Sequence, residues 1–328
     1  MSFLKDKSVL ITGGTGSFGK AFVKKVLEDD QVSKLVVFSR DELKQFEMAE
    51  ELNSPKLRYF LGDIRDYQRL LRATDGIDVI VHAAAMKQIP AAEYNPMEAI
   101  KTNVIGAENI VNASIENGIQ HVVALSTDKA ANPANLYGAT KLCSDKLMIA
   151  GNVLAGSRNT KFSAVRYGNV LGSRGSVIPF FLDKAKTGSI PITDERMTRF
   201  WLTIQEGVKF VLDSFERMHG GEIFVPKIPS FKVTDVARVV CPGVPTQVIG
   251  IRPGEKLHEV MITEDDSHYT FEFEDHYAIV SPALIASGGY GKNQKKVAEG
   301  FRFSSDSNTN WHTHESFKNL LKVNGILA

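Results

Sequence analysis

Short apolar runs alternate with helix-period segments through the first half of the chain. The runs are rich in β-branched residues and span 9–12, 34–39, 57–63, 78–85, 121–127 and 162–169. Strands that are apolar along their whole length and are separated by helices form parallel sheets covered on both faces. We therefore predict an α/β fold with a doubly wound parallel sheet.

The strand–helix rhythm breaks after residue 170. The segment 171–200 mixes loops with one short helix, and a helix followed by a strand at 221–226 then returns to the sheet. The remainder reads as a smaller α+β region. With 328 residues, the chain is long enough for two subdomains. We predict one domain from 1–170 plus about 201–226, and a substrate domain from about 171–200 plus 227–328.

Three glycines at three-residue spacing follow the first predicted strand in LITGGTGSFGKAF. Glycine permits a tight turn and a close backbone approach to a diphosphate, and the free N–H groups of the next helix attract its charge. A glycine triplet alone is a weak signal, but the first βα junction is the required context. The alternative is a tight turn and nothing more. We assign the diphosphate of a dinucleotide, in a Rossmann-type sheet, to Gly13, Thr15, Gly16, Ser17, Phe18 and Gly19.

The end of the second strand distinguishes two dinucleotides. An NAD site places a carboxylate there, about 20 residues past the loop, to bind the ribose 2′-hydroxyl. This chain has Ser39 and Arg40, with Lys44 one helical turn further on. A hydroxyl and two cations favour the 2′-phosphate of NADP, although Arg40 paired with Asp41 or Glu42 would leave NAD open. We expect further cofactor contacts after the third and fourth strands, from Asp63, Ile64, Ala83 and Ala84.

A tyrosine and a lysine four residues apart, Tyr137 and Lys141, share one face of a predicted helix. A nearby ammonium favours the phenolate, so we expect a lowered Tyr137 pKa and a base for a sugar hydroxyl. Lys141 can also hold the nicotinamide ribose. Thr127, at the end of the fifth strand, is expected to donate to the same substrate oxygen. His82 and Trp201 are expected to lie in the core.

Composition excludes several classes of partner. A net charge of +1 gives no bulk electrostatic reason to bind nucleic acid or an anionic membrane. The two cysteines, Cys143 and Cys241, have no metal spacing, which suits a reducing cytoplasm and predicts no metal site. No signal-peptide pattern and no membrane-spanning apolar run is evident. Any anionic ligand must therefore be held by a local basic cluster.

Five motifs together resemble the extended short-chain dehydrogenase/reductase superfamily. They are TGGTGSFG, STDK, YGATK, RYGNVLGSRGSVIP and GIRPGEKLHEVM. More narrowly, they are similar to the inverting, 5-epimerising UDP-N-acetylglucosamine 4,6-dehydratases of bacterial pseudaminic acid synthesis. The similarity covers nearly the whole chain apart from the C-terminal segment, where SSDSNTNW is the main feature. The resemblance implies a homo-oligomer based on dimers, with a hexamer as one such assembly.

The resemblance gives Asp128 and Lys129 a role. Family enzymes oxidise the sugar at C4, remove the acidified C5 proton, expel the C6 hydroxyl as water and return the hydride to C6. Lys129 would be the C5 base, which requires a depressed pKa from burial or from a cation such as Lys141. Asp128 would be the acid, and both reach one pocket only if the strand has ended by Asp128. The alternative is a structural ion pair at a strand end.

A UDP-sugar needs cations for its diphosphate and donors for its uracil and ribose. Lys87 follows the fourth strand, and Asn169 and Arg174 follow the sixth. The resemblance assigns Arg252 to phosphate and Glu255 to ribose hydroxyls, in IRPGEK. Arg199 is a further candidate that otherwise packs at the hinge.

The expected function is thus that of an NADP-dependent UDP-N-acetylglucosamine 4,6-dehydratase with inversion at C5. A retaining UDP-sugar 4,6-dehydratase differs in the C5 configuration of its product. A non-catalytic NADP sensor on the same fold would show no turnover, and the Thr127, Tyr137 and Lys141 set argues against it.

Overall fold

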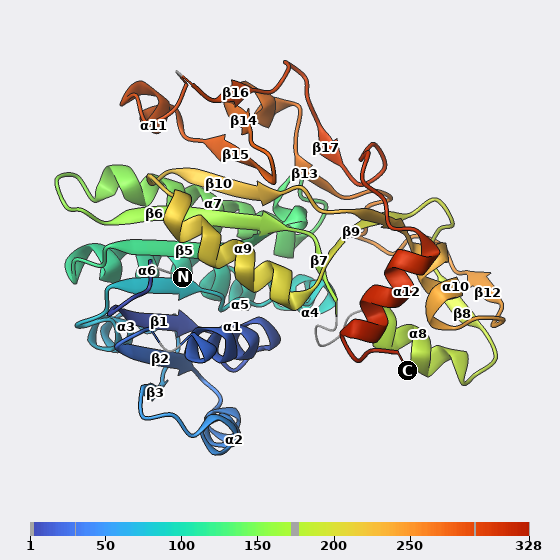
Figure 1. Ribbon diagram of the computed structural model, residues 1–328, viewed down its shortest axis with the longest axis horizontal. Coiled ribbons are helices and arrows are strands. Elements are labelled where there is room, and N and C mark those ends of the chain that lie inside the picture. Colours follow the sequence, from blue (N-terminus) through green and yellow to red (C-terminus); the bar gives the residue numbers. More distant parts are fainter. Residues whose placement is uncertain (1–2, 30, 172–176, 292, 328) are drawn as a thin grey trace.

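A ten-stranded sheet runs through the computed structural model, which describes residues 3–29, 31–171, 177–291 and 293–327 (Figure 1). The strand order is β16-β14-β15-β10-β6-β5-β4-β1-β2-β3, and neighbours from β10 to β3 are parallel. The parallel strands are β1 (Ser8–Thr12), β2 (Lys34–Ser39), β3 (Leu57–Leu61), β4 (Val79–His82), β5 (His121–Thr127), β6 (Lys161–Tyr167) and β10 (Glu222–Pro226). The predicted doubly wound parallel sheet is confirmed.

Helices cover both faces of this sheet. On one face α1 (Ser17–Glu28) contacts α9 (Ile204–Arg217), and on the other α6 (Gly106–Glu116) packs between α3 (Tyr67–Ala73) and α7 (Leu136–Leu154). Because successive strand residues point to opposite faces, Val9 and Ile11 enter one buried apolar cluster and Leu10 enters the other. The expected buried positions of His82 and Trp201 are confirmed, each with 1% of its surface exposed.

Three antiparallel strands extend the sheet beyond β10. They are β15 (His276–Val280), β14 (Thr270–Glu272) and β16 (Lys295–Lys296). These strands come from the part of the chain that the sequence assigns to the substrate domain. The division into two domains stays a prediction, but the main sheet crosses it because β15 pairs directly with β10.

Most of the smaller elements gather around a third apolar cluster beside the sheet (Figure 1). Its centre includes the stacked rings of Phe231 and Phe317, whose centroids lie 4.4 Å apart. The smaller strands are β7 (Asn169–Val170), β8 (Ile190–Ile192), β9 (Thr198–Leu202), β11 (Ser230–Lys232), β12 (Thr246–Val248), β13 (Val260–Ile262) and β17 (Phe303–Ser304). Of these, β7, β13 and β17 pack instead against the first cluster, which contains Val9 and Ile11. The helices are α8 (Val177–Ala185), α10 (Val233–Val240) and α12 (His314–Val323).

The other short elements connect these layers. They are α2 (Glu42–Leu52), α4 (Ile89–Tyr94), α5 (Pro96–Ile100), the π-helix η1 (Lys101–Ile105), the 3₁₀ turns η2 (Asp128–Ala130) and η3 (Asp265–Tyr269), and α11 (Pro282–Ala286). Within the described ranges, every helix is too short or too polar to cross a membrane.

Candidate active site

One cleft of about 1150 Å³ lies beyond the carboxyl ends of the parallel strands. Such crevices are the usual ligand sites of open α/β sheets. The cleft is lined by all the predicted site residues that the structure describes, except Asp128, which is buried beneath it. Arg174 lies outside the described residues.

The glycine loop is built for close contact with a ligand. Gly13 has φ +67°, and a Cβ there would lie 2.9 Å from Ala84 Cα, so only glycine fits. The hydroxyl of Thr12 accepts the N–H groups of Ala83 and Ala84, at 3.2 Å each, and thereby fixes the facing loop. Helix α1 begins at Ser17, and its N-cap residue Gly16 makes no side-chain cap hydrogen bond. The positive end of the helix dipole at this point suits a phosphate group.

The end of β2 and the start of α2 carry the expected hydroxyl and cations. Ser39 Oγ accepts from Gln45 Nε2 at 3.0 Å, and Lys44 pairs with Asp41. The Arg40 side chain is 64% exposed and makes a loose ion pair with Asp63, with 3.6 Å between Nη1 and Oδ2. A loose, exposed pair leaves this guanidinium able to turn toward an anionic ligand at little cost.

The tyrosine and lysine of the predicted pair both lie on α7. Asn135 caps this helix by accepting the Gly138 N–H at 2.8 Å. A Cβ on Gly138 would lie 2.2 Å from the Lys129 carbonyl oxygen, so glycine allows α7 to pack directly on η2. This contact brings Tyr137 and Lys141 to the end of β5.

The expected lowering of the Tyr137 pKa is wrong for the protein without its ligands. Burial raises the pKa of Tyr137 to about 12, although the charge of Lys129 and a hydrogen bond with Thr127 act in the opposite direction. Lys141 is itself buried, and burial lowers its pKa. The phenol is therefore protonated at neutral pH here, because desolvation outweighs the nearby cation.

Asp128 and Lys129 form an ion pair at the end of β5. The strand ends at Thr127 and a 3₁₀ turn follows, so both side chains meet on one side, as the prediction required. Asp128 Oδ1 accepts from Thr127 Oγ1 at 2.8 Å and from Lys129 Nζ at 3.0 Å. Asp128 is fully buried, whereas 24% of the Lys129 side chain is exposed in the cleft.

The expected depression of the Lys129 pKa is also wrong. Burial alone would lower it, but the carboxylates of Asp128 and Glu259 outweigh burial and raise the Lys129 pKa. The sequence prediction considered Lys141 as the influential neighbour and overlooked Glu259. At neutral pH, without ligands, Lys129 is an ammonium group held between two carboxylates.

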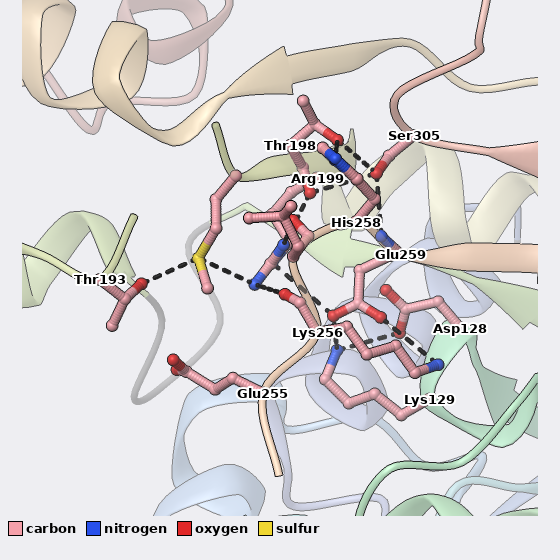
Figure 2. A network of polar contacts seen from close by, with 12 residues as sticks. Asp128, Lys129, Thr193, Thr198, Arg199, Glu255, Lys256, His258, Glu259 and Ser305 are labelled. Atoms are coloured by element: carbon pink, nitrogen blue, oxygen red, sulfur yellow. Dashed lines mark hydrogen bonds and ion pairs between the residues drawn. The ribbon is translucent and has the colours of Figure 1, made fainter. Parts of the chain in front are cut away.

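Glu259 is the site residue that the sequence analysis missed. It immediately precedes β13 and is 3% exposed, yet it lines the cleft. Three cations surround its carboxylate: Lys129 at 3.6 Å, Arg199 at 3.7 Å and Lys256 at 3.9 Å (Figure 2). The sequence motif GEKLHE contains both Glu255 and Glu259, but the sequence analysis assigned a function only to Glu255.

The residues predicted to hold the sugar nucleotide are in different states. Asn169 Oδ1 is buried without a hydrogen-bond partner among the described residues, so it is ready to meet a ligand. Burial and the charge of Lys129 lower the pKa of Lys87. Arg252 and Glu255 pair with each other at 2.7 Å. The Arg199 guanidinium donates to the carbonyls of Thr198 and Leu257, at 2.7 and 3.1 Å, which indicates a structural use.

Two hydrogen bonds tie the IRPGEK segment to the end of the turn that carries Lys129 and to the N-cap of α7. Lys256 Nζ donates to the Ala131 carbonyl at 2.6 Å, and Asn135 Nδ2 donates to the Gly254 carbonyl at 2.8 Å. The segment expected to hold the nucleotide is therefore in direct contact with the reacting centre.

The profile of the polysaccharide biosynthesis protein family matches residues 9–281. The chain belongs to this family. It is 56% identical over 327 residues to the "UDP-N-acetylglucosamine 4,6-dehydratase (inverting)" of Campylobacter jejuni, covering 97% of each chain. It is 39% identical over 331 residues to the "UDP-glucose 4-epimerase" of Rickettsia canadensis, covering 98% of this chain and 97% of that one.

Several solved protein structures share the fold of this chain. The X-ray structure of Pen from Bacillus thuringiensis matches with a TM-score of 0.91 and 38% identity, over 99% of this chain and all of that one. The dTDP-glucose 4,6-dehydratase DesIV of Streptomyces venezuelae, solved with NAD bound, matches with a TM-score of 0.68 at 22% identity, over 76% and 86%. The predicted membership of the extended short-chain dehydrogenase/reductase superfamily is confirmed.

Proposed function

We propose that this family member is an inverting UDP-N-acetylglucosamine 4,6-dehydratase. The observation that carries the proposal is a second proton-transfer pair, Asp128 and Lys129, placed directly beside Thr127, Tyr137 and Lys141 in one cleft. Oxidation of a hydroxyl uses only Thr127, Tyr137 and Lys141. Loss of water between C5 and C6 needs one more base and one more acid. The 56% identity to a relative named for this reaction supports the same conclusion.

The proposed base for the C4 hydroxyl is the Tyr137 phenol, which lines the cleft. A nicotinamide dinucleotide, which the glycine loop and the cleft residues fit, would supply the hydride acceptor at C4 and the hydride donor at C6. Thr127 would bind the C4 oxygen, and Tyr137 would take its proton. Lys141, buried beside them, supplies a positive charge that favours the resulting phenolate. The 4-keto group then acidifies the C5 proton.

The ion pair of Asp128 and Lys129 needs only one proton shift to become reactive. Transfer of the shared proton across the 3.0 Å hydrogen bond gives a neutral lysine and a protonated aspartic acid. Lys129 then takes the C5 proton while its C–H bond breaks. Asp128 supplies its proton to the departing C6 hydroxyl, so water leaves and the net charge of the pair is restored. Because the Lys129 pKa is raised in the protein without ligands, this proton shift is uphill there, and the bound substrate and cofactor must favour it.

We propose NADP as the dinucleotide, on the support of Ser39, Arg40 and Lys44. NADP is expected to bind more tightly than NAD. Arg40→Ala should weaken NADP binding alone by about 10- to 150-fold, since a hydrogen bond to a charged group contributes about 1.5–3 kcal/mol. Titration of both cofactors into apo-protein, followed by calorimetry, measures this. Equal affinities in the wild type would refute the assignment, and so would an Arg40→Ala protein that binds NADP normally.

The decisive experiment follows deuterium through one turnover. UDP-N-acetylglucosamine labelled with deuterium at C4 should give a 4-keto-6-deoxy product labelled at C6, with inverted C5 and with solvent hydrogen at C5. NMR of the product reads all three outcomes. Retained C5 configuration would identify a retaining dehydratase, and a 4-epimer would identify the activity for which the Rickettsia relative is named. No turnover would favour the cofactor sensor.

A further inference from the structure

Glu259 has a fixed backbone and a side chain aimed into the reacting centre. Its N–H donates to Ser305 Oγ at 2.9 Å, and its carbonyl accepts the Ser305 N–H at 2.8 Å. Ser305 is fully buried and also hydrogen-bonds Thr198 Oγ1 at 2.7 Å (Figure 2). The serine of the C-terminal SSDSNTNW motif therefore anchors Glu259 at both backbone polar groups. A side chain on such a frame is held in one place.

The carboxylates of Glu259 and Asp128 both contact the ammonium of Lys129, at 3.6 Å and 3.0 Å (Figure 2). Asp128 is fully buried, and Glu259 lines the cleft. Glu259 Oε2 has no hydrogen-bond partner among the described residues, although Lys256 lies 3.9 Å away. A buried carboxylate without a full set of partners is costly. Its position in the cleft beside Lys129 suggests a use for this costly arrangement in the reaction.

We propose that Glu259 is a positioning residue that holds Lys129 at the reacting carbon and keeps the Asp128–Lys129 pair singly protonated. The inference rests on the proposed function. It also links the nucleotide to the chemistry, because Glu255, Lys256 and Glu259 belong to one segment. A UDP group seated on Arg252 and Glu255 would fix the same stretch that fixes the base.

The sign of the effect follows from the charges around Lys129. Two anions face it, Asp128 from η2 and Glu259 from the segment before β13. Its cationic and phenolic neighbours are Arg199 on β9, Lys256, Lys87 after β4 and Tyr137 on α7. Replacement of Glu259 by glutamine removes one of the two anions and leaves every cation. The Lys129 pKa must therefore fall.

The pair loses its acid once the shared proton leaves, so activity should decline at alkaline pH above the Lys129 pKa. In the wild type that pKa is raised and the decline lies at high pH. Glu259→Gln should move the decline to lower pH and lower kcat about 10²-fold through misplacement of the base, with KM for UDP-N-acetylglucosamine little changed. Glu259→Asp keeps the charge on a shorter side chain. It should return the alkaline decline of activity (the alkaline limb of the pH profile) to its wild-type position without restoring the full rate.

Glu264→Gln is the matched control, because Glu264 is an exposed glutamate a few residues further along the chain. It should show wild-type rates and a wild-type pH profile. Glu259→Gln with an unchanged pH limb and unchanged C5 exchange would overturn the inference. If Glu259→Gln fails to bind NADP and UDP, the fold is damaged, and Glu259→Asp then decides through the same limb.

A substrate-independent measurement separates this inference from the proposed function. Dinitrofluorobenzene reacts with an amine only in its neutral form. Mass spectrometry of the labelled protein gives the rate of labelling at Lys129 at one fixed pH. The rate should rise about tenfold for each unit by which the pKa falls in Glu259→Gln. Faster labelling in a protein that makes no 4-keto-6-deoxy sugar would refute the function and keep the inference. Equal labelling in an active dehydratase would do the reverse.

Discussion

Tyr137→Phe is expected to lower kcat about 10²–10⁴-fold, the usual contribution of a general base. The substitution removes only the hydroxyl that takes the C4 proton, and the ring stays in the packed interface between α7 and η2. Binding of UDP-N-acetylglucosamine and NADP should therefore persist. Single-turnover absorbance of reduced cofactor measures the C4 oxidation that the variant should lose.

Tyr94→Phe is the control for this variant, because Tyr94 is 88% exposed at the end of α4 and does not line the cleft. It should turn over like the wild type. Near-normal turnover of Tyr137→Phe would mean that another group deprotonates the C4 hydroxyl. Thr127 would then be the next residue to test, since it shares hydrogen bonds with both Tyr137 and Asp128.

Lys129→Arg should stop the reaction after oxidation at C4. Arginine keeps the positive charge between Asp128 and Glu259, but a guanidinium does not give up its proton at any working pH. Reduced cofactor should accumulate, while product formation and solvent-deuterium exchange at C5 both fall about 10²–10⁴-fold. Rapid-quench NMR and cofactor absorbance follow the two halves of the reaction separately.

Lys129→Ala should show the same block with lower stability, since it leaves two buried carboxylates without their shared cation. Asp128→Asn should stall later, with C5 exchange surviving better than water loss. Exchange at the wild-type rate in Lys129→Arg would assign Lys129 to a structural ion pair. Identical behaviour of the Lys129 and Asp128 variants would point to a concerted elimination.

The parallel part of the fold was predictable because its signal is local. Each apolar run from β1 to β6 carries its own periodicity, and the glycine loop marks the first junction. The strands β14, β15 and β16 gave no such signal. They are short, and they join the sheet antiparallel through β10, a pairing between residues far apart in sequence. A βαβ pattern predicts parallel strands only, so it does not indicate antiparallel strands added at the sheet edge.

Many of the cleft residues were predictable for the same reason, since they follow the end of a strand or the start of a helix, whereas Arg252 and Glu255 were assigned from the family resemblance. The pKa values of these residues could not be predicted from the sequence. The Lys129 pKa depends on Glu259, which lies far along the chain and reaches the site only through β13 and its partner β17. For Tyr137, the prediction named Lys141 as the cation that lowers the pKa, whereas Lys129 is the cation that acts on it, and desolvation outweighs that charge. Sequence spacing carries no measure of burial.

The main sheet is assembled from three separate stretches, 8–167, 222–226 and 270–296. Strand β10 meets β6 through only two register pairs, whereas β15 covers its other edge through five. An uncovered strand edge is a template for pairing with other chains. Chains emerge from the ribosome with the N-terminal part first. The growing polypeptide therefore carries an open strand edge, first on β6 and then on β10, until β15 has been made, and shielding of that edge by a chaperone would matter most in this interval.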